Sequence, residues 1–188
     1  GAYPKSKTLA ERAAWGFINS AENSNKMELA AINPPLILGP VPNKNFRTSV
    51  ELIRTYMLGQ VPGVGRIKMG IVDVRDVAAA IILAMKTPKA AGNRFLCSGG
   101  TLWIKEIAQI LHKEYAKRGY KIPTFQFPSF LIRFIALFDK KISLVTNSLD
   151  WDYELSNEKA KRILKWTPRS NEEAILSMAE SLIEHGFV

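Results

Sequence analysis

The sequence predicts an α/β fold with a parallel sheet, and two observations indicate it. A helical repeat of apolar residues over positions 9–21 is followed by a continuous apolar run over positions 29–38. A second apolar run, at positions 94–98, lies between segments with helical periodicity. Continuous apolar strands are buried on both faces, as in parallel sheets covered by helices. Helices that alternate with such strands form the repeating unit of α/β proteins.

Composition limits the size and the partners of this fold. The chain has 188 residues, of which 47% are hydrophobic, which suffices for one core and a small lobe but is short for a two-domain enzyme. Its formal charge of +9 comes from 26 Lys and Arg against 17 Asp and Glu. The basic residues lie in separate segments, whereas a polyanion-binding tract shows as a local basic run. We therefore expect no nucleic acid and no membrane as partner.

The cysteine content and the hydropathy pattern indicate a compartment. Cys97 is the single cysteine, so no internal disulfide forms, and this suits a reducing environment. It lies in an apolar run, where a buried structural thiol is expected. No segment approaches ~18 uninterrupted apolar residues, and no basic start leads into an apolar signal core. The expectation is a cytoplasmic protein.

The first helix is expected to begin near Pro4, a residue suited to a first helical turn. Apolar residues at helical spacing predict one broad buried stripe, at Leu9, Ala10, Ala13, Ala14, Phe17, Ile18 and Ala21. Tyr3 and Lys7 share one face of this helix, with Cβ atoms about 5–6 Å apart. An ammonium group there lowers the pKa of a tyrosine, which can then act as a general acid or base. Taken alone, the pair also fits an aromatic edge beside a solvated lysine.

The middle of the chain alternates helix and strand. A helix is predicted over residues 50–58, a strand over 67–72 and a helix over 73–85. The glycines of residues 62–65 belong to a loop and not to a dinucleotide fingerprint, because no buried strand precedes them and no helix follows at once. Asp73 and Asp76 could form a general acid and base, but their spacing favours an N-cap and a first-turn carboxylate.

The last third is predicted to be mainly helical. A helix follows Thr101, and His112 borders its apolar stripe with no second metal ligand at a useful spacing. A short strand is expected over residues 121–127, and an apolar helix over 129–138 that protein or ligand should cover. After a short helix near residue 160, a capping box at Ser170 and Glu173 opens a last helix that Gly186 ends.

The stretch of residues 3–15, Tyr-Pro-Lys-Ser-Lys-Thr-Leu-Ala-Glu-Arg-Ala-Ala-Trp, resembles the active-site helix of the extended short-chain dehydrogenases/reductases. The likeness is closest to the dihydroflavonol reductase-like and the aldehyde or ketone reductases. The resemblance implies that Tyr3 protonates the substrate carbonyl as hydride arrives. It also implies that Lys7 binds the nicotinamide ribose and tunes the tyrosine.

The Asn-Pro-x-x-x-x-Gly-Pro pattern at residues 33–40 resembles the same family. By residue-to-residue match, Pro34, Leu36 and Ile37 would contact the nicotinamide end of the cofactor, and Ser49 would lie near its phosphates. For Ser49, a helix N-cap explains the residue equally well.

The resemblance covers nearly all of the chain but only the second half of the family. It implies the C-terminal portion of a doubly wound NAD(P)-binding Rossmann-type fold and a small mixed substrate-binding lobe. Residues 1–45 and 66–100 would belong to the nucleotide-binding domain, and residues 46–65 and 101–188 mostly to the lobe. The family's glycine-rich pyrophosphate turn and the residue that selects NAD or NADP precede the catalytic tyrosine. We therefore expect a truncated chain, inactive alone.

The expected function of the parent protein is reduction of a small aldehyde or ketone, with NADP(H) favoured over NAD(H). Two alternatives stay open: a sugar-nucleotide epimerase or dehydratase of the same superfamily, and a non-catalytic binding or assembly module. In the family's strand order, the strand of residues 29–38 lies between that of residues 94–98 and one absent here. Because an unpaired strand edge recruits another strand, we expect a homo-oligomer.

Overall fold

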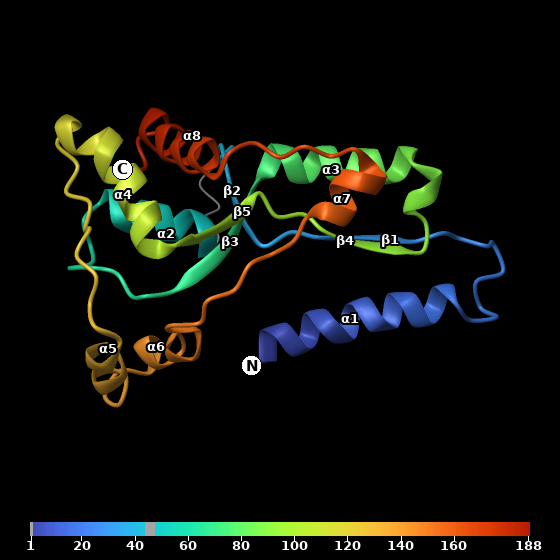
Figure 1. The fold of residues 1–188 in the computed structure, drawn as a ribbon, viewed down its shortest axis with the longest axis horizontal. Helices are drawn as coiled ribbons and strands as arrows, with labels where there is room; N and C mark the ends of the chain where they lie inside the picture. Colours follow the sequence, from blue (N-terminus) through green and yellow to red (C-terminus); the bar gives the residue numbers. More distant parts are fainter. Residues whose placement is uncertain (1, 44–47) are drawn as a thin grey trace.

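The computed structural model describes residues 2–43 and 48–188, which form two short sheets with helices around them (Figure 1). The strands are β1 (Ala30–Asn33), β2 (Leu36–Leu38), β3 (Lys68–Asp73), β4 (Asn93–Leu96) and β5 (Gly100–Trp103). The α-helices are α1 (Ala2–Ile18), α2 (Thr48–Met57), α3 (Val74–Lys86), α4 (Ile104–Tyr115), α5 (Ser129–Ile135), α6 (Lys140–Ser143), α7 (Glu158–Leu164) and α8 (Asn171–Glu184).

The sheets confirm the α/β prediction. In one sheet β1 pairs with β4 in parallel, from Ala30 opposite Asn93 to Asn33 opposite Leu96. In the other sheet β3 lies between β2, which it pairs in parallel, and β5, which it pairs antiparallel. Strand β5 was not predicted, because four residues between Ser98 and a strong helical repeat give little strand signal.

The run over residues 29–38 was predicted to be one strand, and this is wrong. Pro34 and Pro35 separate β1 from β2. Proline has no N–H to donate to a sheet ladder, so a pair of prolines ends the strand. The two pieces therefore pair with different neighbours, β4 and β3. Within the described residues β1 has β4 as its one strand partner, so its other edge is open, as the family's strand order implied.

Two apolar clusters form the core. One joins α2, α4 and α8 to β2 and β3, through side chains such as Ile53, Leu111 and Leu182 that are fully buried. The other joins α3, β4 and α7, around Phe95 and Trp166. Helix α7 thus packs on the β1–β4 half of the molecule, above the sheet in Figure 1.

Cys97 lies in the second of these clusters and is fully buried. Burial raises the pKa of its thiol to about 11, so the reactive thiolate is scarce at neutral pH. A structural role, as expected from its apolar surroundings in the sequence, is confirmed.

The helical predictions hold best where a local signal marks the end of the helix. Asp73 caps α3, accepting a hydrogen bond from the Arg75 N–H at 2.8 Å. Ser170 caps α8 by accepting from the Glu173 N–H at 3.1 Å. Gly59, just after α2, has φ +62°, and a Cβ there would lie 2.8 Å from the Lys121 carbonyl oxygen. Only glycine meets both conditions without strain.

Two apolar segments are more exposed in the structure than their hydrophobic patterns predicted. No residue of α1 is buried, and Leu9 and Phe17 are 52% and 43% exposed. The helix runs beside the β1–β4 sheet in Figure 1, and no other described element covers its apolar stripe. Helix α5 likewise projects from the body together with α6, and Phe130 and Phe138 are 74% and 80% exposed.

Residues 121–127 do not form the expected strand. Their one sheet-like contact is an isolated bridge between Gln126 and Val64. Pro123 and Pro128 limit the N–H groups available to a ladder, which accounts for the difference.

Candidate functional site

Tyr3 and Lys7 lie one turn apart at the start of α1. The Lys7 Nζ is 5.5 Å from the centroid of the Tyr3 ring. Two hydroxyl groups bond back to carbonyl oxygens of the first turn. Ser6 Oγ donates to the Tyr3 carbonyl at 2.8 Å, and Thr8 Oγ1 donates to the Pro4 carbonyl at 2.9 Å. Tyr3 is 72% exposed, so a solute can reach its hydroxyl. The helix thus holds a phenol and an ammonium together at an accessible position.

The expected nicotinamide contacts lie where the β1–β4 sheet gives way to the second sheet. Pro34 follows the last residue of β1, and Leu36 and Ile37 begin β2 opposite Ile71 and Val72. All three predicted residues are half-buried. Leu36 packs against the α2–α4–α8 cluster and Ile37 against the α3–β4–α7 cluster, so these two side chains face opposite sides of the strand.

Ser49 lies on a different element. It is half-buried in the first turn of α2, a helix that packs against β2 and α8. The structure therefore brings Tyr3 and Lys7 together on α1, groups Pro34, Leu36 and Ile37 at the β1–β2 junction, and holds Ser49 on α2.

Asp73 and Asp76 do not form an acid–base pair, because each is engaged with an arginine. Asp73 accepts hydrogen bonds from Arg75 Nε and Nη2 at 2.8 and 2.7 Å. Burial alone would raise the pKa of the Asp73 carboxyl, but the hydrogen bonds from Arg75 hold it below its ordinary value. The N-cap interpretation of Asp73 is confirmed.

Asp76 serves a long-range contact that the sequence did not reveal. Its Oδ2 accepts from the Arg169 N–H at 2.7 Å, and its Oδ1 pairs with the Arg169 guanidinium group. Asp76 as a residue is 3% exposed. Its backbone carbonyl oxygen accepts a hydrogen bond from Trp166 Nε1 at 2.9 Å. Asp76 therefore ties α3 to the segment that leads into α8, and no local signal could have indicated a partner 93 residues away.

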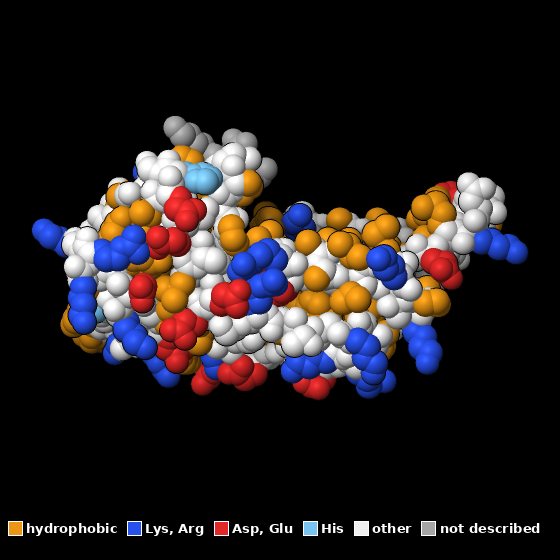
Figure 2. Space-filling view, turned by 90° about the horizontal axis from the view of Figure 1, so that it is seen from above, with side chains coloured by type: hydrophobic (Ala, Val, Ile, Leu, Met, Phe, Trp, Pro, Cys, Tyr) orange, Lys and Arg blue, Asp and Glu red, His pale blue; other side chains and the backbone are white. Residues whose placement is uncertain are grey.

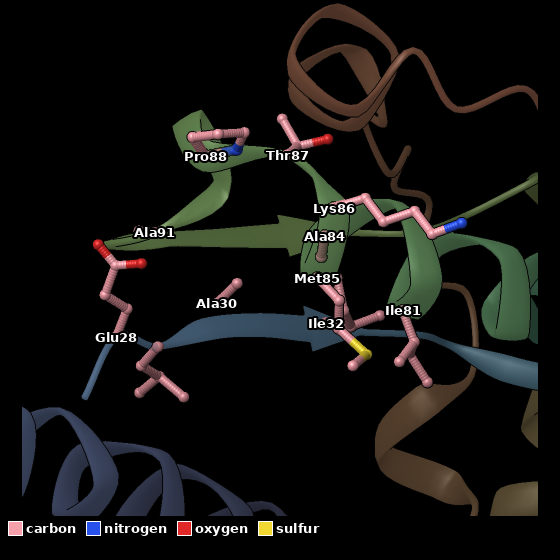
Figure 3. Close-up of a pocket in the computed structure, with 11 residues that line it drawn as sticks. Glu28, Ala30, Ile32, Ile81, Ala84, Met85, Lys86, Thr87, Pro88 and Ala91 are labelled. Carbon is pink, nitrogen blue, oxygen red and sulfur yellow. The ribbon is translucent and has the colours of Figure 1, made fainter.

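An apolar hollow of about 610 Å³ borders β1 and α3 (Figure 3). Ala30 and Ile32 of β1 form one side, and Ile81, Ala84 and Met85 of α3 form the other. None of the residues predicted to act in catalysis or cofactor binding lines this hollow. The hollow marks an uncovered apolar surface next to β1, and we do not regard it as a catalytic site.

Hydrophobic side chains also gather on the half of the surface that holds α3, with lysines and arginines spread among them (Figure 2). Ile81, Ile82 and Met85 of α3 are 45%, 51% and 82% exposed. Soluble monomers seldom leave so many large apolar side chains of one helix in contact with water.

Across residues 2–43 and 48–188, no three or more His, Cys, Asp or Glu side chains are grouped so that they could hold a metal ion. His112 is exposed, with Nδ1 3.3 Å from the Ile122 carbonyl oxygen.

No helix in the described part of the chain is both long and apolar enough to span a membrane.

Comparison with known proteins gives related sequences and folds, although no protein-family model matches the chain. Cinnamoyl-CoA reductase 1 of Petunia hybrida is 32% identical over 185 residues, which are 98% of this chain and 48% of that protein. The NADPH-dependent methylglyoxal reductase GRE2 of Saccharomyces cerevisiae is 33% identical over 128 residues, 65% of this chain and 37% of that protein. The chain thus spans about half the length, or less, of these curated relatives.

Among solved structures, yeast methylglyoxal/isovaleraldehyde reductase Gre2 complexed with NADPH superposes with a TM-score of 0.75. The two sequences are 29% identical, and the match covers 100% of this chain and 52% of that one. This similarity agrees with the parallel strand pairs and the helices packed around them.

Proposed function

Because this chain belongs to the extended short-chain dehydrogenase/reductase family, we propose that the whole protein reduces an aldehyde or ketone with NADPH. The observation that carries the proposal is the Tyr3–Lys7 pair, held 5.5 Å apart on one accessible helix face. It is supported by relatives whose names describe reductases of carbonyl compounds, one of them NADPH-dependent.

In this proposal the chain's residues handle the proton and orient the reactants. Tyr3 donates its phenolic proton to the carbonyl oxygen. Lys7 has an ammonium group suited to hydrogen bonding with ribose hydroxyls, and its charge favours the phenolate that Tyr3 becomes. NADPH, when bound, supplies the hydride that the carbonyl carbon receives. The product is an alcohol, and a proton from solvent restores Tyr3.

The remaining predicted residues have roles in cofactor binding in the proposed function. Pro34, Leu36 and Ile37 contact the nicotinamide end, and Ser49 lies near the phosphates. Residues 1–45 and 66–100 contribute to the nucleotide-binding domain, and residues 46–65 and 101–188 mostly form the substrate-binding lobe. We also propose that the protein works in the cytoplasm, where a chain with one buried cysteine requires no disulfide.

The test is an assay of the full-length protein that carries this chain. Consumption of NADPH would be followed with methylglyoxal and with cinnamoyl-CoA as representative substrates. Turnover of either with NADPH supports the proposal. Absence of turnover with a panel of aldehydes and ketones, in a folded protein that binds NADPH, would contradict it.

The 188-residue chain alone is expected to bind NADPH and NADH poorly and to show no turnover. In the dinucleotide-binding fold the pyrophosphate rests on backbone N–H groups at a helix N-terminus after a glycine-rich turn. The sequence of the chain contains no such turn after a buried strand. Isothermal titration measures the affinity, and micromolar binding would show that another segment holds the cofactor.

We further propose that the isolated chain self-associates. The open edge of β1, the adjoining hollow and the exposed stripe of α1 support this, because strand edges and large apolar patches recruit partners. Light scattering at low micromolar concentration should give a mass well above 21.0 kDa. Phe17→Glu on α1 and Met85→Lys on α3 change exposed positions, so the variant that restores a monomer identifies the contact. A monomeric native chain would contradict self-association.

A further inference from the structure

Helix α1 is joined to the sheet through the Glu11 carboxylate. No residue of the helix is buried, so apolar packing gives it little orientation. Glu11 Oε1 accepts from Arg94 Nε at 2.8 Å, and Oε2 accepts from Arg94 Nη2 at 3.1 Å. Such a two-point contact fixes direction as well as distance, because both groups are planar. Arg94 belongs to β4, so the contact spans helix and sheet.

The same carboxylate collects further contacts. Trp15 Nε1 donates to Glu11 Oε1 at 3.2 Å. The hydrogen bond from Arg94 is the main reason why the pKa of Glu11 is lowered, and Trp15 and the Asn33 side chain lower it further. The Asn33 side chain lies close to Glu11, but its buried Nδ2 makes no hydrogen bond to the described residues. Glu11 is thus hydrogen-bonded to β4 through Arg94 and to Trp15 of its own helix.

Glu11 lies on the same ridge of the helix as the proposed catalytic pair. Tyr3, Lys7, Glu11 and Trp15 follow one another at intervals of four residues, which places them along one side of an α-helix. At 1.5 Å per residue, Lys7 is about 6 Å and Tyr3 about 12 Å along the axis from Glu11. A rotation or tilt of α1 at Glu11 therefore displaces both side chains.

We propose that Glu11 and Arg94 are positioning residues that orient the Tyr3–Lys7 face of α1 relative to the β1–β4 sheet. This inference rests on the proposed function of Tyr3 and Lys7. Exposed ion pairs add little stability, and Arg94 is 62% exposed, so the contribution of the pair is orientation of the helix.

The first test measures the contact in the 188-residue chain itself. Hydrogen exchange of the α1 amides should accelerate about two- to fivefold in Glu11→Gln and in Arg94→Gln, the scale of an exposed ion pair. The double variant should exchange no faster than either single one. Exchanging the charges, with Glu11→Arg and Arg94→Glu together, should slow exchange again.

Arg12→Gln is the matched control. Arg12 neighbours Glu11 on α1 and lines the same hollow of about 250 Å³ as Glu11 and Arg94, yet no ion pair of its guanidinium group is found among the described residues. Hydrogen exchange of the α1 amides in Arg12→Gln should equal that in the unaltered chain. Unchanged exchange in both single variants of the pair would overturn the inference.

The second test separates positioning from general stability in the full-length protein. Glu11→Gln should lower kcat about tenfold, in line with the sensitivity of catalysis to small misplacements, and should weaken NADPH binding because Lys7 moves with the helix, while the Tm stays nearly constant. The charge-exchanged variant should recover most of the lost turnover. Unchanged kcat in Glu11→Gln would overturn the positioning role. A charge-exchanged variant whose kcat is as low as that of Glu11→Gln would also overturn it. Full activity of Tyr3→Phe would instead refute the proposed function and leave the exchange result standing.

Discussion

Turnover of the full-length protein is expected to fall at least ~100-fold when Tyr3 is replaced by phenylalanine, the scale on which enzymes lose rate without a general acid. The substitution removes one oxygen atom at a side chain that is 72% exposed, so it should leave folding intact. Cofactor affinity should change little, because the phenol acts on the carbonyl oxygen. Steady-state kinetics with NADPH and an aldehyde measures the loss, and circular dichroism checks the fold.

Lys7 is expected to behave differently. Lys7→Met keeps an unbranched side chain that is one atom shorter, but removes the charge that lies 5.5 Å from the centroid of the Tyr3 ring. Both turnover and cofactor affinity should therefore decrease, since in the proposed function Lys7 stabilises the phenolate of Tyr3 and hydrogen-bonds to the cofactor ribose. Lys5→Met, two residues away on an exposed part of the same helix, is the control and should leave both unchanged. Near-normal turnover in Tyr3→Phe would eliminate the proposed roles of both residues.

The elements that the sequence predicted well are those with local signals. The N-caps at Asp73 and Ser170 and the glycine after α2 lie within a few residues of the helix ends that they define. The proximity of Tyr3 and Lys7 has the same local origin, because a helix brings residues four apart together whatever the rest of the chain does, whereas their proposed roles depend on the family resemblance.

Long-range pairing and exposure could not be predicted in this way. Periodicity shows that one face of α1 is apolar, but whether anything covers that face depends on the rest of the protein. The division of residues 29–38 between two sheets depends on which strands lie beside each piece as well as on the two prolines. The contact of Glu11 with Arg94 joins residues 83 apart, and neither residue carries a local sign of its partner.

The Asp76–Arg169 contact is the clearest such case, and it should be the most costly single contact to remove. Asp76 is 3% exposed and receives both the backbone N–H and the guanidinium group of Arg169. In Asp76→Ala these donors lose their acceptor next to fully buried Trp166. Hydrogen bonds to a charged group contribute more than neutral ones, so their loss should cost stability although the Arg169 side chain is 38% exposed.

We expect Asp76→Ala to lower the free energy of unfolding by about 2 kcal/mol, the scale of lost hydrogen bonds to a buried carboxylate whose partner, Arg169, keeps access to water. That is a large share of the roughly 5–15 kcal/mol that stabilises a typical domain. Urea unfolding measures it, with an unchanged slope showing that the denatured state is the same. Glu172→Ala, at an exposed position in the first turn of α8, is the control and should stay within about 0.5 kcal/mol. Arg169→Ala should be less harmful when Asp76 is already alanine, because the two residues share one contact. A loss below about 1 kcal/mol in Asp76→Ala would mean that water replaces the Asp76 carboxylate as the acceptor for Arg169, and that the remaining contacts between α3 and α8, such as Arg75 with Glu173, suffice to hold them together.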